Sequence, residues 1–112
     1  MNLYDKKGNP IELEEYTKLF ADRSYQIVKQ TRLSDGTHIS TVWLGIDHSF
    51  GGEVPVIFET LVTRKSNDEE EMYRYTSEEE ARSHHEYLCE GGDTEQDKGY
   101  ISRWKQISLD ID

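Results

Sequence analysis

Apolar side chains recur at two different spacings along this chain, and each spacing predicts one kind of element. The apolar residues of the first segment share one helical face: Leu13, Tyr16, Leu19 and Phe20. Asn9 can serve as the N-cap of this helix, with Pro10 at the first helical position and Glu12 two residues later. The pattern predicts a helix over 10–21 that packs through its apolar face.

Strand-forming residues then follow in stretches that turn signals separate. The predicted strands are 25–33, 38–46, 56–62 and 72–75. Asp35-Gly36 is typical of a tight hairpin, and Pro55 can precede a strand without losing a ladder hydrogen bond. The middle two strands are apolar on both faces, which is typical of central strands. The polar stretch 65–71 is expected to be a flexible connection, and the short last strand to be an edge.

A second helix is predicted directly after the last strand. Thr76 or Ser77 can cap it, and the acids of its first turn suit the positive end of the helix dipole. Gly91-Gly92 ends it. Its expected buried residues are Ala81, His84 or His85, and Leu88. The fold class is therefore α+β: a four-stranded antiparallel meander with two helices packed on one face and an appended C-terminal segment.

The chain divides into a core domain, 1–92, and a C-terminal segment, 93–112. Residues 93–99 contain no apolar side chain and are interpreted as a linker. The apolar residues beyond it need burial: Tyr100, Trp104, Ile107, Leu109 and Ile111. Alternation of the last three favours docking as an added strand, either on the chain's own sheet edge or on a second copy, which would give a homodimer.

Charge limits the choice of partner. The formal net charge is −10, and residues 53–97 hold 14 acidic side chains against 4 basic ones. Such a surface repels phosphate backbones, so direct nucleic-acid binding is not expected. A protein partner with a basic surface is expected instead. The proposed partner-binding residues are Asp68, Glu69, Glu70, Glu71, Glu78, Glu79 and Glu80. The alternative is that the acids serve solubility only.

Cysteine content and hydropathy indicate the compartment. Cys89 is the single cysteine, so no intramolecular disulfide can form, and no apolar run is long enough to cross a bilayer. The N-terminus also lacks the order of a signal peptide. We therefore expect a protein of a reducing cytoplasm that does not enter a membrane.

Candidate chemistry centres on a possible ligand site of four residues. Asp47 and His48 follow the second strand, while His85 and Glu86 lie on the second helix and are possible spatial partners. Carboxylate and imidazole groups can bind a metal, but their spacing here matches no zinc signature. We expect no metal, no cofactor and no catalytic residue. The simpler interpretation is that Asp47 caps the loop, His48 is exposed and His85 fills the helix–sheet seam.

The pair Trp43 and Phe58 has two interpretations. Trp43 lies in the middle of the second strand among apolar neighbours, so we expect it to be buried. With Phe58 on the adjacent strand it forms either part of the core or the floor of an aromatic pocket.

Four segments together resemble a group of small phage and prophage proteins. They are Tyr4-Asp5-x-x-Gly8-Asn9-Pro10, Ser40 to His48 (STVWLGIDH), Ile57-Phe58-Glu59-Thr60, and Arg74 to Ala81 (RYTSEEEA). The four segments occur in the same order as in that group, and the resemblance covers roughly residues 4–90. It implies a phage or mobile-element origin and a non-structural accessory role. One departure is His84, which stands where the group usually has glycine.

Two function hypotheses follow. The first is an accessory protein that binds another protein and inhibits a bacterial nucleic-acid-directed defence, as anti-CRISPR proteins do, with its acids imitating nucleic acid. The second is a small enzyme or a metal- or ligand-binding protein that uses the Asp47/His48 loop and His85.

Overall fold

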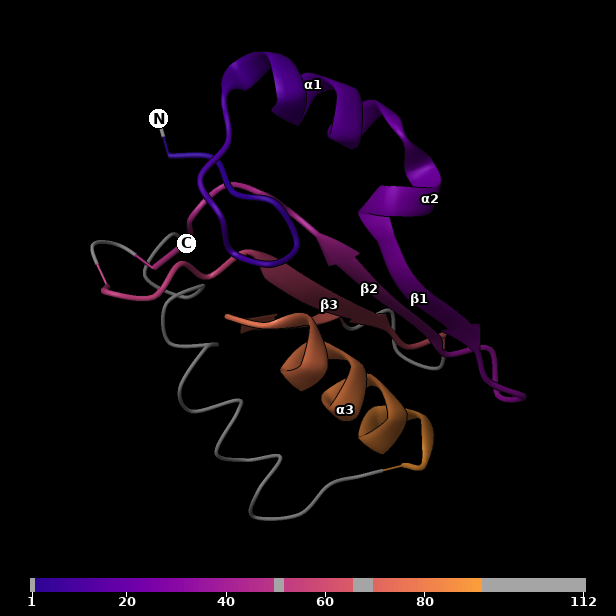
Figure 1. Ribbon diagram of the computed structural model, residues 1–112. Helices are drawn as coiled ribbons and strands as arrows, with labels where there is room; N and C mark the ends of the chain where they lie inside the picture. The colour runs from indigo at the N-terminus through magenta and orange to yellow at the C-terminus, as the bar shows by residue number, and fades with distance from the viewer. Residues whose placement is uncertain (1, 50–51, 66–69, 92–112) are drawn as a thin grey trace.

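The fold is a four-stranded antiparallel sheet with helices packed against it. The computed structural model describes residues 2–49, 52–65 and 70–91, so the predicted C-terminal segment lies outside the described residues. The elements are α1 (Leu13–Ala21), α2 (Arg23–Gln26), β1 (Ile27–Arg32), β2 (His38–Trp43), β3 (Phe58–Thr63), β4 (Glu70–Tyr75) and α3 (Glu78–Cys89). The strand order β1-β2-β3-β4 is a meander, as predicted (Figure 1).

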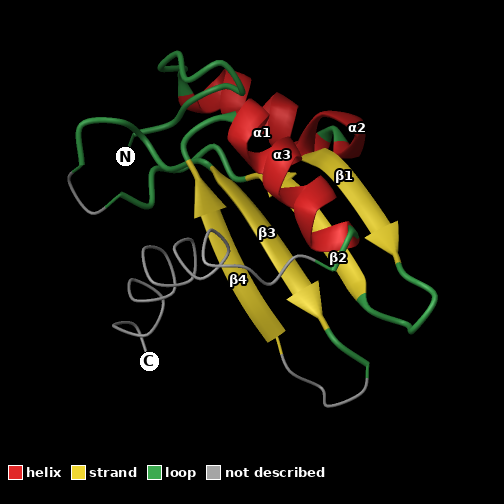
Figure 2. Ribbon diagram, turned by 90° about the horizontal axis from the view of Figure 1, so that it is seen from below, coloured by secondary structure: helices red, strands yellow, loops and turns green. Residues whose placement is uncertain are grey.

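Both predicted helices lie on the same face of the sheet, because successive residues of a strand point to opposite faces. Thr41 of β2 contacts His85 of α3. Trp43, two residues further along β2, contacts the aromatic rings of α1. Figure 2 shows α3 lying across the strands on this face. The α+β prediction with two helices on one face is therefore confirmed.

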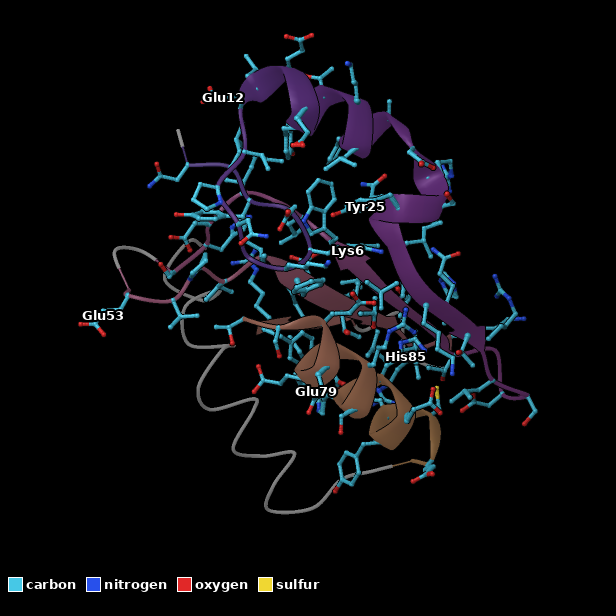
Figure 3. All side chains as sticks on the ribbon, in the orientation of Figure 1. Lys6, Glu12, Tyr25, Glu53, Glu79 and His85 are labelled. Carbon is cyan, nitrogen blue, oxygen red and sulfur yellow. The ribbon has the colours of Figure 1, made fainter. Side chains whose placement is uncertain are left out.

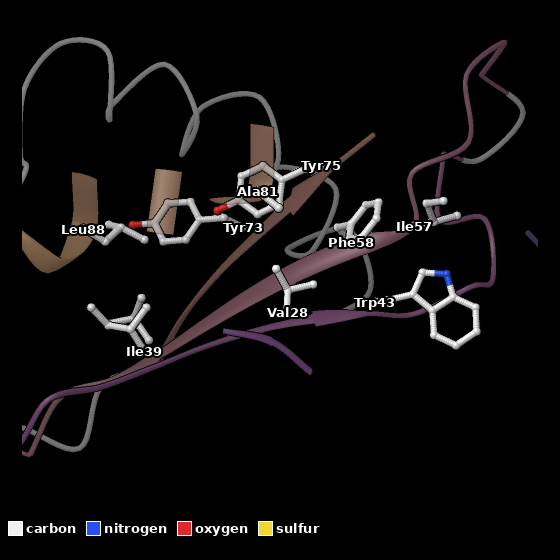
Figure 4. Packing of buried hydrophobic residues seen from close by; sticks show 10 residues of the cluster. Val28, Ile39, Trp43, Ile57, Phe58, Tyr73, Tyr75, Ala81 and Leu88 are labelled. Atoms are coloured by element: carbon white, nitrogen blue, oxygen red, sulfur yellow. The ribbon is translucent and has the colours of Figure 1, made fainter. Parts of the chain in front are cut away.

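The core lies between this face and the helices. Trp43 is fully buried, as predicted, and it is the direct cross-strand partner of Phe58. Both belong to the core cluster that Figure 4 draws, so the pair forms packing and not the floor of an open pocket. The cluster consists of Val28, Ile39, Trp43, Ile57, Phe58, Val62, Tyr73, Tyr75, Ala81 and Leu88.

The start of the first helix was predicted wrongly. Helix α1 begins at Leu13, and its N-cap residue is Glu12, which makes no side-chain capping bond. Asn9 instead belongs to a turn in which its backbone N–H donates to the Asp5 carboxylate at 2.9 Å. Pro10 forms a β-bridge with Tyr4. A side-chain-capped turn thus holds residues 9 and 10 in extended backbone, where the sequence signal placed a helix start.

The first strand is shorter than predicted because a helical turn precedes it. Residues 25 and 26 belong to α2, and β1 begins at Ile27. The Asp22 side chain caps this turn by accepting from the Ser24 backbone N–H at 3.0 Å. Strand β1 contains a bulge at Val28, where the register with β2 shifts, and it forms one edge of the sheet.

Strands β2 and β3 are the central pair, as their two-sided apolar pattern predicts. β2 ends at Trp43 and not at 46, since Gly45 has φ of +76°. A Cβ at this position would lie 2.6 Å from ring atoms of both Trp43 and Tyr16, so glycine is required for the backbone angle and for the space. β3 covers 58–63 and not 56–62.

The last strand starts two residues earlier than predicted. β4 begins at Glu70, which pairs with Thr63, so Glu70 and Glu71 belong to the strand and not to a flexible connection. Helix α3 follows the prediction closely. Ser77 caps it by accepting from the Glu80 N–H at 3.1 Å, and Gly91 follows its end with φ of +78°.

Candidate functional site

The predicted acidic residues fall into two groups that β4 separates. Glu70 and Glu71 start the strand, whereas Glu78–Glu80 follow its end and form the first turn of α3. At about 3.3 Å per residue the strand holds the two groups roughly 20 Å apart. Asp68 and Glu69 lie outside the described residues. The acids that are close in sequence therefore do not form one compact cluster.

Several of these acids bond to neighbouring residues and two face solvent. The Glu71 carboxylate forms an ion pair with Arg64 at 3.1 Å, and Glu78 forms one with Arg82 at 2.9 Å. Glu80 accepts a long bond from the Thr76 N–H, at 3.4 Å. Glu70 and Glu79 are exposed. These two remain the best placed of the predicted set to meet a partner.

Helix α1 adds acids that the sequence analysis did not select. Glu12, Glu14 and Glu15 are all exposed around the start of this helix. The run Glu12-Leu13-Glu14-Glu15 was the available signal, but it lies outside the acidic window at 53–97. In Figure 3, Glu12 marks the start of α1, while Glu79 lies on α3 and Glu53 on a separate loop.

Tyr25 shows that acids of α1 and α3 act on one region. Burial raises the pKa of the Tyr25 hydroxyl, and the negative charges of Asp5, Glu78 and Glu15 raise it further. The hydrogen bond that the Lys6 backbone N–H donates to this hydroxyl opposes the rise. Lys6 lies over the same ring, 4.6 Å from its centre. Acids from α1, from α3 and from the N-terminal loop thus lie in the surroundings of one aromatic group, together with one lysine.

Asp47 caps its own loop, as the simpler interpretation predicts. Its Oδ1 accepts from the backbone N–H of Ser49 at 2.8 Å and of Val56 at 2.9 Å, and its Oδ2 accepts from the Ser49 hydroxyl at 2.9 Å. Burial alone would raise the pKa of Asp47, but these bonds outweigh it and hold the pKa below its ordinary value. Both oxygens thus already serve the loop.

His48 lies beside a charged pair on the sheet face opposite α3. Glu59 and Arg74 are cross-strand partners, and Arg74 Nε donates to Glu59 Oε2 at 3.2 Å. Burial lowers the pKa of His48, and the positive charge of Arg74 lowers it further, while Glu59 and Asp47 oppose the change. His48 is half-buried and not exposed as expected.

Arg74 is unusual within this group because its side chain is only 10% exposed. Its Nη1 atom is buried and has no hydrogen-bond partner in the part of the chain that the structure describes. Buried guanidinium nitrogens normally have an acceptor. Glu59 and Arg74 thus pair with each other beside the half-buried His48.

His85 occupies the seam between α3 and the sheet on the other face. Its Nδ1 lies 2.7 Å from Thr41 Oγ1, and its Nε2 lies 2.9 Å from Thr31 Oγ1. Thr41 Oγ1 also bonds Thr60 Oγ1 at 2.5 Å. Both imidazole nitrogens are therefore bonded in a fully buried position. This confirms the simpler interpretation, in which His85 is a satisfied polar residue of the seam.

The four residues of the predicted ligand site do not come together. Asp47 and His48 lie near the Glu59–Arg74 pair, whereas His85 contacts threonines of the opposite sheet face. Glu86 forms an ion pair with Lys29. Among the described residues, no group of three or more histidine, cysteine, aspartate or glutamate side chains could hold a metal ion.

Comparison with known proteins adds no family assignment. No family model, no curated protein and no solved structure matches this chain. Within the ranges 2–49, 52–65 and 70–91, no helix has both the length and the apolar character needed to cross a membrane.

Proposed function

We propose that this protein acts by binding a partner protein that has a basic surface. The observation that supports this most is a set of exposed acids in a chain with net charge −10: Glu12 at the N-cap of α1, Glu14 and Glu15 in α1, and Glu79 in α3. Such a field attracts a basic surface and repels nucleic acid. The protein is expected not to bind nucleic acid directly.

The biological role that we propose is inhibition of a bacterial nucleic-acid-directed defence, in the manner of anti-CRISPR proteins. The acids would occupy the basic surface on which the defence protein binds nucleic acid. The resemblance of four sequence segments to small phage and prophage proteins supports this role, and it also supports action in the host bacterial cytoplasm. The partner is then the defence protein itself.

The alternative, a small enzyme or ligand-binding protein, has less support. It needs Asp47, His48 and His85 to act on one ligand. The Asp47 oxygens accept three bonds from their own loop, and both nitrogens of His85 bond threonines. These groups would have to give up their present bonds before they could bind or activate a substrate.

A plaque assay with charge-reversed variants tests the proposal. The protein is expressed in bacteria with an active CRISPR defence, and we expect a targeted phage to form plaques as it does on bacteria without the defence. The double variant Glu15→Lys, Glu79→Lys should lose this protection, because both residues belong to the exposed acids of α1 and α3 that support the proposal. The matched control is Glu53→Lys with Glu90→Lys, which changes the net charge equally at other exposed positions.

Two results would contradict the proposal. If the two double variants behaved alike, the acids would serve solubility and not recognition. If the parent protein protected no phage and bound no purified defence protein at low salt, the proposed role would be wrong. A true complex should also weaken between about 50 mM and 300 mM salt, since screening shortens the range of its attraction.

A further inference from the structure

Helix α1 exposes apolar side chains in a way that α3 does not. Leu13 is 65% exposed and Phe20 is 42% exposed, and α1 buries none of its residues. Residues seven apart on a helix lie on one face, two turns from each other. Leu13 and Phe20 therefore form one apolar stripe along α1, which we call the α1 stripe.

The aromatic residues beneath α1 hold this stripe in place. The Tyr16 ring lies 5.6 Å from Trp43 and 5.4 Å from Phe20, between ring centres. The Tyr16 hydroxyl donates to the Leu44 carbonyl at 3.2 Å. Phe20 itself lies 6.4 Å from the Trp43 ring. One side of α1 is thus attached to the core, so the stripe is presented to solvent by a supported helix.

Acidic residues border the α1 stripe. At its Leu13 end, Glu12 and Glu14 are exposed on the two sides of Leu13 along the chain, whereas Glu15 lies about 200° around the helix from Leu13. The single cation of the helix, Lys18, forms an ion pair with Glu14 at 3.9 Å. Glu12, Glu14, Glu15 and Lys18 line a shallow hollow in the surface next to the stripe, and neither Leu13 nor Phe20 lines it. An apolar stripe with an anionic border complements a surface that has an apolar side chain between basic ones.

We propose that the α1 stripe is the docking surface for a basic segment of the partner protein, one that presents an apolar side chain flanked by Lys or Arg. This rests on the proposed function and names the surface that recognises the partner. A second copy of this chain fits less well, because it would place Glu12, Glu14 and Glu15 against the same acids.

The test uses a synthetic amphipathic helix of about 18 leucine and lysine residues as the probe, long enough to form a helix on binding. Its affinity for the full chain is measured by fluorescence anisotropy, and the contact residues by NMR chemical shifts. We expect the largest shifts at Leu13, Thr17 and Phe20. A peptide of leucine and glutamate in the same order is the charge control.

A pair of matched double variants locates the contact. Leu13→Ser with Glu12→Gln should weaken probe binding about tenfold, since it removes one buried leucine and one charge. Glu12 makes no capping bond, so this change should leave α1 intact, as a melting curve would verify. The control is Val54→Ser with Glu53→Gln, because Val54 is 58% exposed and Figure 3 shows Glu53 far from Glu12.

The outcomes separate this inference from the proposed function. If both double variants bind the probe alike and the shifts lie at Glu70 or Glu79, the α1 stripe is not the docking surface. The proposed binding of a basic partner through the acids would still stand. If the lysine and glutamate peptides bind the parent chain equally, the charge argument behind both proposals fails. If the parent dimerises in solution and Leu13→Ser abolishes the dimer, a second copy occupies the stripe and the inference is overturned.

Discussion

Helices α1 and α3 lie on the same face of one sheet, yet they use it differently. α3 buries four residues, two of them histidines, and its side chains bond the strands below. α1 buries none and rests on the core mainly through Tyr16 and Leu19, which pack against the core cluster. The contrast indicates that α3 completes the core, whereas α1 is supported by it and presents its outer surface to other molecules.

The contacts beneath the two helices also differ in chemistry. Below α3 the hydroxyls of Thr60 and Thr41, the imidazole of His85 and the hydroxyl of Thr31 form one buried chain of hydrogen bonds. Below α1 the contacts are between aromatic rings. Removing a buried polar partner leaves its neighbours unsatisfied, whereas removing a ring leaves a cavity. The packing contacts beneath α1 and those beneath α3 can therefore be tested separately by substitution.

The largest expected effect is at Trp43, on which both α1 and α2 rest. Trp43→Ala should lower the free energy of unfolding by about 3–5 kcal/mol, because the fully buried ring contacts Tyr16, Phe20 and Tyr25. Urea denaturation measures this. Trp43→Phe, which keeps a ring, should cost less. A parent-like midpoint for the alanine variant would mean that α1 and the core are not coupled through this residue.

A smaller loss of stability is expected where α3 packs on the sheet. His85→Ala should lower the free energy of unfolding by about 3 kcal/mol, since it opens a cavity and leaves the Thr31 and Thr41 hydroxyls without their partner. The neighbouring Glu86→Ala is the control, and it should lower the free energy of unfolding much less, because its pair with Lys29 is exposed to solvent. Equal losses in the two variants would contradict the role given to the seam.

The smallest effect is a dependence of stability on pH. Burial lowers the pKa of His85; Lys29, Arg82 and His84 lower it further, and Glu86 opposes them. A histidine whose pKa is lower in the folded state favours folding above its unfolded pKa of about 6.5, and this contribution is lost as pH falls. Urea midpoints should therefore decrease from pH 7.5 to pH 5.

The variant His85→Gln distinguishes the contribution of His85 to this pH dependence from that of His48. Burial and Arg74 also lower the pKa of His48, so it contributes in the same direction. Glutamine can still bond the threonines but does not titrate, so the decrease between pH 7.5 and pH 5 should become smaller. An unchanged decrease would assign the whole effect to groups other than His85.

The sequence predicted those parts of the fold that depend on local pattern. The two-sided apolar runs placed β2 and β3 at the centre of the sheet, and Ser77 and Gly91 marked the ends of α3. Each of these signals acts within a few residues. The start of α1 was wrong for a related reason, because Asp5 bonds the Asn9 N–H and draws residue 9 into a turn of the preceding loop.

The candidate site was less predictable because it depends on distant contacts. His85 is 44 residues from Thr41 and 54 from Thr31, so no spacing rule could show that both of its nitrogens are bonded. The pair Glu59–Arg74 beside His48 likewise requires the register of β3 with β4. The α1 stripe could not be predicted for another reason. Leu13, Tyr16 and Phe20 all fit the apolar face of the predicted helix, and only the structure shows that Tyr16 packs on the core while Leu13 and Phe20 are exposed.

The bulge at Val28 has a consequence for the behaviour of this protein at high concentration. An edge strand with a regular ladder can recruit the edge of another molecule and begin an aggregate. In β1 the bulge interrupts the register, and the side chains of Lys29 and Arg32 are exposed along the same strand. Straightening β1 by deleting Val28 would therefore be expected to shorten the time that a concentrated solution stays clear, even where the fold itself survives.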